Sequence, residues 1–157
     1  MVELLRVDDR LLHGQVAYAW SKSLPIDLII IANDEASQDK AAKATFALAK
    51  PAGMSLVIST VEKTVAFLNS EKARNYRSLV LVNNLADAAA IARATEDVSS
   101  INVGGLRERA ESKRYLPAIC LTPDDLATIG ALSRDGYEVY AQQVPSDTKT
   151  NLAGFVD

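Results

Sequence analysis

Short apolar runs alternate with helix-like segments along the whole of this 157-residue chain, and few folds accommodate such an order. The runs are rich in Val, Ile and Leu, and several are apolar throughout, which is typical of strands buried on both faces of a sheet. The predicted strands are residues 2–7, 28–32, 55–59, 79–82, 101–103, 118–121 and 138–141.

The segments between these strands have the spacing of amphipathic helices, with apolar residues three and four positions apart. The last helix is the best delimited, because Thr122 can cap its first turn, Pro123 has no N–H to leave unpaired there, and Gly136 follows its end. The predicted helices are residues 15–22, 39–49, 61–68, 85–94 and 124–132.

Regular alternation of strand and helix favours βαβ units joined by right-handed crossovers. We therefore expect an α/β protein with three layers, α/β/α, around a mainly parallel, open sheet of about six or seven strands. The length is that of one folding unit, so the sequence predicts a single domain over residues 1–157.

Charge and composition exclude several classes of protein. The chain has 17 Lys and Arg against 20 Asp and Glu, a net charge of −3, so it has no basic field with which to bind nucleic acid. Its longest strongly apolar run is residues 28–32, far short of the ~20 residues that span a bilayer, and no signal peptide is recognisable. The single Cys120 lies in an apolar run and is predicted to be a core residue in a reducing compartment. We expect an unexported cytoplasmic protein.

Ligands of open parallel sheets bind beyond the carboxyl ends of the strands, so the loops at that edge are the place to look for a site. The loop after the first predicted strand has the sequence Asp-Asp-Arg-Leu-Leu-His-Gly at residues 8–14. Other polar loops predicted at the same edge are residues 33–35, 83–84, 104–109 and 142–147.

His13, the only histidine in the chain, lies where this first loop meets a helix. One nitrogen of a neutral imidazole can accept a phosphoryl group while an acceptor such as Asp8 or Asp9 holds the other N–H. Arg10 can contact phosphate oxygens with its guanidinium. The backbone N–H groups at the helix start, those of Gly14 and Gln15, are also predicted to face an anion. A lone histidine at a helix start is more often a surface or capping residue, and the residues alone leave that alternative open.

Several other residues have two possible roles. Arg107 and Arg109 can hold a phosphoryl group or dock an acidic partner, or they can belong to a solvated loop. Asp34 can orient Arg10, although capping of the next segment is the more common use of such a residue. Gly104 and Gly105 lack the spacing of a dinucleotide-binding motif and predict a tight turn.

Residues 5–16, Leu-Arg-Val-Asp-Asp-Arg-Leu-Leu-His-Gly-Gln-Val, resemble the phosphorylation-site signature of a known family. That family is the IIB component of the mannose, fructose and sorbose type of the bacterial sugar phosphotransferase system. Further similar segments follow in order, so the resemblance covers nearly the whole chain. They are residues 30–35, 101–105, 121–126, 135–139 and 143–147.

The resemblance implies a cytoplasmic phosphocarrier at the inner face of the membrane. By this resemblance, His13 accepts a phosphoryl group on Nδ1 from a phosphohistidine of a IIA protein, and Arg10 contacts the phosphate. The group then passes to a sugar imported by the membrane components IIC and IID, without a metal or an organic cofactor. Asn83, Asn84 and residues 106–114 depart from the family pattern, which leaves the sugar and the partner preference open.

An alternative is a non-enzymatic signalling module of the receiver type, in which an acidic pair like Asp8 and Asp9 binds Mg²⁺. A receiver also needs an acceptor aspartate at the end of its third strand, where this chain has Ser59 and Thr60. A metal-dependent hydrolase is disfavoured because one histidine and scattered carboxylates give no recognisable ligand spacing, so no metal site is predicted.

Overall fold

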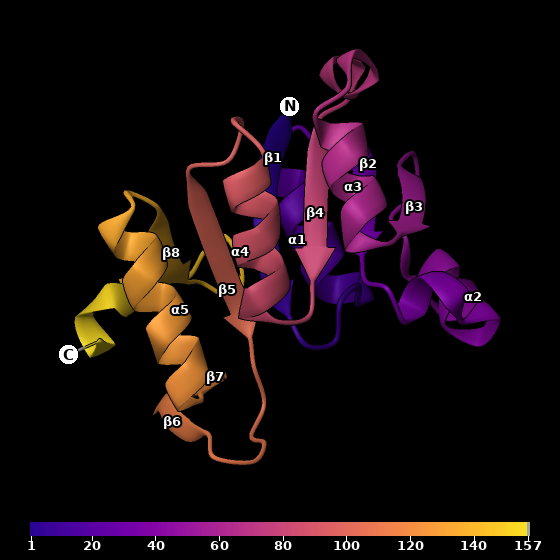
Figure 1. Ribbon diagram of the computed structural model, residues 1–157. Helices are drawn as coiled ribbons and strands as arrows, with labels where there is room; N and C mark the ends of the chain where they lie inside the picture. The colour runs from indigo at the N-terminus through magenta and orange to yellow at the C-terminus, as the bar shows by residue number, and fades with distance from the viewer. Residues whose placement is uncertain (157) are drawn as a thin grey trace.

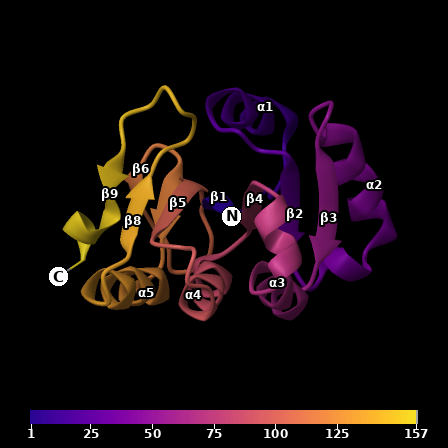
Figure 2. The same ribbon diagram turned by 90° about the horizontal axis from the view of Figure 1, so that it is seen from above.

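The computed structural model describes residues 1–156, which form a seven-stranded main sheet, a separate two-stranded sheet and five α-helices. The strands of the main sheet lie in the order β3-β2-β4-β1-β5-β8-β9 (Figure 1, with β9 labelled in Figure 2). The strands are β1 (Val2–Asp8), β2 (Leu28–Ala32), β3 (Ser55–Ser59), β4 (Ser78–Val82), β5 (Ser100–Gly105), β6 (Lys113–Leu116), β7 (Ile119–Leu121), β8 (Glu138–Ala141) and β9 (Thr150–Asn151). The helices are α1 (Gly14–Ser23), α2 (Lys40–Ala49), α3 (Val61–Leu68), α4 (Leu85–Ala94) and α5 (Pro123–Arg134).

The main sheet is parallel except at one edge, which confirms the predicted α/β class and strand number. Only β9 is antiparallel, and it pairs with β8. The strand predicted at residues 118–121 exists as β7, but it is not part of the main sheet as expected. It pairs antiparallel with β6 in the separate two-stranded sheet. Neither β6 nor β9 was predicted, because β6 begins with two basic residues and β9 has only two residues.

The helices form two layers on opposite faces of the sheet. Figure 2 shows α3, α4 and α5 side by side on one face and α1 on the other, with α2 near the β3 edge. Alternate residues of the central strands supply the two cores, as the two-residue period of a strand requires. Val7 and Ile101 belong to the core under α3, α4 and α5, whereas Ile29 and Trp20 belong to the core under α1. Cys120 is buried, as predicted.

The order of strands changes direction around β1. The chain leaves β1 toward β2 through α1, on one face, and returns from β4 to β5 through α4, on the other. Crossovers that leave in opposite directions open a crevice at the carboxyl ends of the strands, where ligands of such sheets bind. In the sheet Asp8 pairs with Gly105, and the Asp9 N–H donates to the Gly105 carbonyl oxygen at 3.0 Å. The loop after β1 therefore lies at this crevice, beside the end of β5.

A capping box begins α5, as the sequence predicted for Thr122. The Thr122 hydroxyl accepts from the Asp125 N–H at 3.0 Å, and the Asp125 carboxylate accepts from the Thr122 N–H at 2.9 Å. Replacing Thr122 with Ala should therefore lower the free energy of unfolding by about 1 kcal/mol, measured by urea denaturation. The half-buried Thr128 of the same helix, whose hydroxyl donates only to the Asp124 carbonyl oxygen, is the control, and its Ala variant should change that free energy by less than about 0.5 kcal/mol. Equal effects of the two substitutions would contradict the capping role.

Candidate functional site

The loop between β1 and α1 is a tight structure built around Asp8. The Asp8 carboxylate accepts from the Arg10 N–H at 3.0 Å, and its carbonyl oxygen accepts from the Leu11 N–H at 2.8 Å. Leu11 has a φ of 58°, a left-handed conformation that a branched side chain adopts only when its surroundings compel it. Leu11 and Leu12 are both buried in the core under α1. These two anchors fix the residue that follows them, which is His13.

The His13 ring is held by the buried Asp8 carboxylate. Its Nε2 lies 2.9 Å from Asp8 Oδ2, while the Asp8 side chain is fully buried and that of His13 is 25% exposed. An ionised carboxylate can only accept, so the hydrogen of a neutral ring is on Nε2 and the lone pair is on Nδ1. Within residues 1–156, Nδ1 has no hydrogen-bond partner. The geometry therefore leaves Nδ1 as the ring nitrogen with an unshared lone pair.

Arg6 lies behind this pair and is 1% exposed. Its Nη2 donates to Asp8 Oδ2 at 3.2 Å, and its Nη1 donates to Asn102 Oδ1 at 2.7 Å and to the Gln142 carbonyl oxygen at 3.2 Å. Burial lowers the pKa of Arg6, and the adjacent Asp8 carboxylate raises it again. An arginine stays protonated under such conditions, so the group is a buried cation. Arg6, Asn102 and Gln142 were not predicted as site residues.

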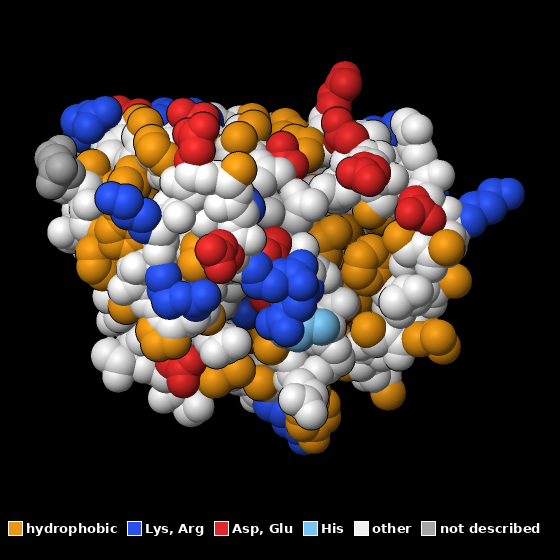
Figure 3. Space-filling model, turned by 90° about the horizontal axis from the view of Figure 1, so that it is seen from below, with side chains coloured by type: hydrophobic (Ala, Val, Ile, Leu, Met, Phe, Trp, Pro, Cys, Tyr) orange, Lys and Arg blue, Asp and Glu red, His pale blue; other side chains and the backbone are white. Residues whose placement is uncertain are grey.

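Arg10 lies in front of Asp8, on the solvent side. Its side chain is 45% exposed, and its Nε lies 3.7 Å from Asp8 Oδ1. This single long contact leaves most of the guanidinium free to reach a ligand at His13. Figure 3 views this edge of the sheet directly and shows basic side chains gathered beside the histidine.

Asp9 does not hold His13; it pairs with Arg107. Its carboxylate accepts from the Arg107 N–H at 2.8 Å and from the Arg107 Nε at 3.1 Å. This contact ties the loop after β1 to the loop after β5 and leaves the Arg107 side chain 71% exposed at the rim. Asp8 is the last residue of β1 and its side chain is fully buried, whereas Asp9 lies in the turn beyond the strand and is half-buried.

Arg109 is engaged away from the site. Its guanidinium pairs with Asp125 and donates to the Cys120 carbonyl oxygen at 3.1 Å, which holds the loop after β5 against the start of α5. This geometry favours neither phosphate binding nor docking of a partner by Arg109, because its guanidinium already bonds to Asp125 and to the Cys120 carbonyl oxygen.

Asp34 caps a helix and does not touch Arg10. Its carboxylate accepts from the Val61 N–H at 2.9 Å, so the helix that it caps is α3 and not the turn that follows Asp34 in the chain. That turn is capped by Asn33, whose side-chain oxygen accepts from the Ala36 N–H at 2.8 Å. Asn84, one of the departures from the family pattern, similarly caps α4.

The first turn of α1 presents its backbone to the same space. The helix begins at Gly14 after an extended His13, and no side chain caps it. A Cβ at Gly14 would meet only the Ala49 carbonyl oxygen, at 3.9 Å, so the fold itself does not require a glycine there. Gly14 and Gln15 are both exposed. Their N–H groups stand at the positive end of a ten-residue helix, next to the His13 ring.

The predicted tight turn at Gly104 and Gly105 is wrong, because both residues are the end of strand β5. The reason for a glycine at position 104 is steric: a Cβ there would lie 2.1 Å from Arg6 Cζ. The guanidinium therefore occupies the space that a side chain would need.

The arrangement is suited to an anion that bonds to a nitrogen nucleophile. Three guanidinium groups and two carboxylates meet at this edge, an excess of one positive charge, and the helix start adds its dipole. The charged residues are Arg6, Asp8, Asp9, Arg10 and Arg107. Among residues 1–156 no three His, Cys, Asp or Glu side chains are grouped as ligands of a metal. In the same part of the chain, every helix is too short or too polar to cross a bilayer.

Comparisons with known proteins agree over the full length of the chain. The family model described as "PTS system sorbose subfamily IIB component" matches residues 2–157. A "Probable phosphotransferase enzyme IIB component" of Streptococcus pyogenes is 36% identical over 163 residues and is covered completely, as is this chain. The mannose-specific EIIAB component of Escherichia coli is 28% identical over 99% of this chain, which spans 48% of that protein.

A solved structure gives the same result. The crystal structure of the IIB domain of the sorbose permease from Klebsiella pneumoniae matches with a TM-score of 0.92 and 30% identity, over 98% of this chain and 94% of that one. Fold and sequence thus agree. The chain belongs to the family of sorbose-subfamily IIB components of the phosphotransferase system.

Proposed function

We propose that the protein is a phosphocarrier in which His13 Nδ1 accepts a phosphoryl group from a phosphohistidine of a IIA protein and passes it to a sugar. The observation that carries this proposal is the contact of 2.9 Å between His13 Nε2 and the buried Asp8, which leaves Nδ1 free and accessible. The alternative of a surface or capping histidine is disfavoured, since the His13 side chain makes no capping hydrogen bond.

In the first step the P–N bond of the donor breaks as a P–N bond to His13 Nδ1 forms. The hydrogen on Nε2 stays where it is, held by Asp8, so transfer between two imidazoles needs no net movement of a proton. In the second step a hydroxyl oxygen of the sugar attacks the phosphorus, the bond to Nδ1 breaks, and the hydroxyl proton goes to a base of the acceptor complex. The first step is reversible because the two bonds are alike.

The protein stabilises the charge on the transferring oxygens. We propose that Arg10, whose side chain is 45% exposed, contacts them with its guanidinium, and that the N–H groups of Gly14 and Gln15 donate to them from the helix start. Little covalent chemistry is needed beyond this, because phosphoryl transfer depends mainly on in-line positioning and on charge stabilisation. The 71% exposure of the Arg107 side chain supports the further proposal that it meets an acidic partner surface.

Membership of the family supports a proposal for the partners. We propose that the donor is a IIA protein and that the sugar is presented by the membrane components IIC and IID, at whose cytoplasmic face this protein works. The match to an EIIAB protein supports a close link between IIA and IIB, since that relative carries both designations in its name. Of the departures at Asn83 and Asn84, Asn84 caps α4 and donates to the Asn83 side-chain oxygen at 2.8 Å.

The proposed function is tested by charging the protein and locating the phosphoryl group. Phosphoenolpyruvate, the general phosphotransferase proteins and a IIA protein are supplied, and the product is examined by ¹⁵N and ³¹P NMR. We expect one phosphohistidine, substituted on Nδ1. A phosphoryl group on Nε2 would contradict the assignment of the nucleophile. An acyl phosphate formed from a small phosphodonor with Mg²⁺ would instead support the receiver module.

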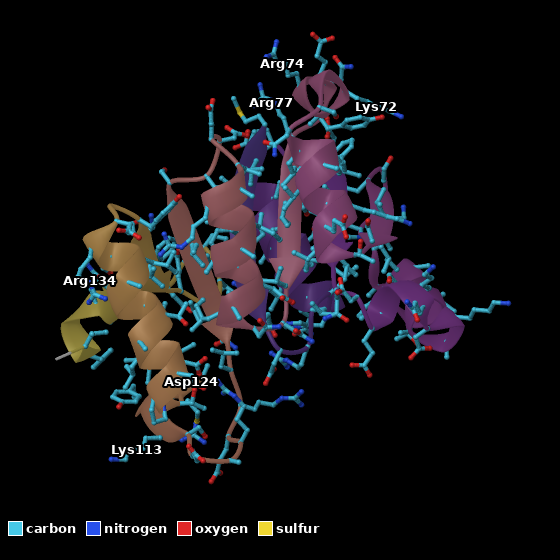
Figure 4. The ribbon with its side chains drawn as sticks, in the orientation of Figure 1. Lys72, Arg74, Arg77, Lys113, Asp124 and Arg134 are labelled. Carbon is cyan, nitrogen blue, oxygen red and sulfur yellow. The ribbon has the colours of Figure 1, made fainter. Side chains whose placement is uncertain are left out.

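Arg10 should matter through the geometry of its guanidinium as well as its charge. Arg10→Lys keeps the charge but loses the planar pair of donors, so transfer from phospho-IIA should slow about tenfold, in the range expected for one charged hydrogen bond. Rapid-quench measurement of phosphoryl transfer checks this. The control is Arg74→Lys at the opposite end of the sheet, labelled in Figure 4, which should leave the rate unchanged. Equal rates for the two variants would exclude Arg10 as a phosphate ligand.

A further inference from the structure

We infer that Arg6 is a positioning residue for this transfer: its buried guanidinium holds the Asp8 carboxylate against His13 and offsets part of the negative charge that Asp8 presents to the imidazole. The inference rests on the proposed function of His13 and adds a residue that touches neither the phosphoryl group nor the partner. Arg6 would thus act on His13 from a buried position in the sheet, behind the exposed site.

The contacts of Arg6 leave its head group almost no freedom. Arg6 donates to three groups on three different strands or their ends: the Asp8 and Asn102 side chains and the Gln142 backbone. Asn102 donates in turn to the same Gln142 carbonyl oxygen, at 3.0 Å. The guanidinium is thus tied to β1, β5 and the end of β8. Asp8 Oδ2 is the atom that it shares with His13, at 3.2 Å and 2.9 Å respectively.

Two surfaces confine the guanidinium from the sides. The Trp20 ring of α1 lies 5.8 Å from Arg6 Cζ, in cation–π range. On β5, Gly104 has no side chain, and a Cβ there would lie 2.1 Å from Cζ and from Nη2. Trp20 and the bare backbone of Gly104 therefore lie on two sides of the guanidinium.

A purely structural explanation is weak. A buried ion pair contributes little net stability, because removing both charges from water costs about as much as their attraction returns. The Arg6 Nε has no hydrogen-bond partner within residues 1–156, which makes burial of this arginine more costly still. An apolar residue at the same position of β1 would avoid these costs. We therefore explain the buried Arg6 guanidinium by its effect on the position and charge of the Asp8 carboxylate.

The effect on His13 follows from charge. A carboxylate alone at 2.9 Å from the ring would favour the imidazolium form, which has no lone pair and is no nucleophile. A cation on the same oxygen reduces that attraction. The remaining charged or titratable groups near the two residues are Arg10, which also disfavours a positive ring, the Asp9–Arg107 pair on the neighbouring loops, and Tyr140 on β8.

His13 is the only histidine, so its ring can be titrated by NMR without interference. Arg6→Met removes the charge and keeps the length of the side chain, and Arg6→Lys restores a charge. With Arg6→Met we expect the midpoint of the imidazole titration to rise by about one pH unit. The pH at which transfer from phospho-IIA is half-maximal should rise with it. Arg6→Lys should return both midpoints toward those of the parent.

Gly104→Ala tests the same inference without removing any charge, which matters if Arg6→Met folds poorly. The added methyl must push the guanidinium off Asp8, so the titration midpoint should rise and transfer should slow at least tenfold. The matched control is Gly105→Ala, where the new Cβ would meet Asp8 Oδ1 at an ordinary 3.6 Å. This variant should transfer within about twofold of the parent.

The outcomes separate this inference from the proposed function. If the parent protein is not phosphorylated on His13, the function fails, whatever the titrations show. If the parent is phosphorylated and the folded Arg6→Met and Gly104→Ala variants titrate at the parent midpoint, the inference is overturned. A loss of transfer that only follows the fraction of folded protein, with an unchanged pH profile, overturns it equally.

Discussion

Replacing His13 with Ala should abolish phosphoryl acceptance, with a loss of more than about 10³-fold that leaves only background label. Within residues 1–156 the chain has no other imidazole, and the carboxylates near the site are engaged with arginines, so no second nucleophile stands in the same place. The measurement is transfer of ³²P from phospho-IIA to the variant, followed on a gel over several minutes. Label at the parent level would remove His13 from the mechanism.

The fold of the His13→Ala variant should stay nearly intact, which makes the result interpretable. The His13 side chain makes no capping hydrogen bond, so its loss costs α1 little. Asp8 Oδ2 keeps its contact with Arg6, so no buried charge is left alone. The midpoint of urea unfolding should therefore lie close to that of the parent. If His13→Ala is both unlabelled and unfolded, the measurement is repeated with His13→Gln, which retains a polar side chain of similar length.

The parts of the fold that follow from local pattern could be predicted from the sequence. Residues 28–32 and 55–59 are strands with the predicted bounds, because their apolar runs end abruptly at polar residues. The same is true of the helix at residues 61–68. The pairing of β7 was not predictable in this way, since an apolar run of three residues says nothing about which strand it will lie beside. Two-residue β9 has no pattern at all.

The exposed half of the candidate site could also be predicted, because the carboxyl-end rule points to the loop that holds His13 and Arg10. The buried half could not. Arg6 lies in a run that predicts only a strand, and its contacts come from Asn102 and Gln142, which are 96 and 136 residues away in sequence. One signal was present: Arg6 and Asp8 are two residues apart, so they share a face of β1, and an opposite charge pair on a buried face is unusual.

Asp8 should be the residue whose loss damages both stability and transfer. Asp8→Ala leaves the 1%-exposed Arg6 guanidinium without a counter-charge, and this should lower the free energy of unfolding by about 3–5 kcal/mol, measured by urea denaturation. It also removes the carboxylate that accepts from His13 Nε2, so transfer should fall about 10²-fold or more even in the folded fraction. A variant with parent stability would contradict the view that Asp8 and Arg6 are a coupled buried pair.

A double variant separates the two effects. Arg6→Met with Asp8→Leu removes both charges at once, so no unpaired ion is buried and most of the stability lost in Asp8→Ala should return. Transfer should not return, because His13 still lacks its acceptor. Recovery of stability without recovery of transfer would show that the Arg6–Asp8 pair serves to position the His13 imidazole and is not needed to stabilise the sheet. Recovery of both would mean that the position of His13 is set by Leu11 and Leu12 alone.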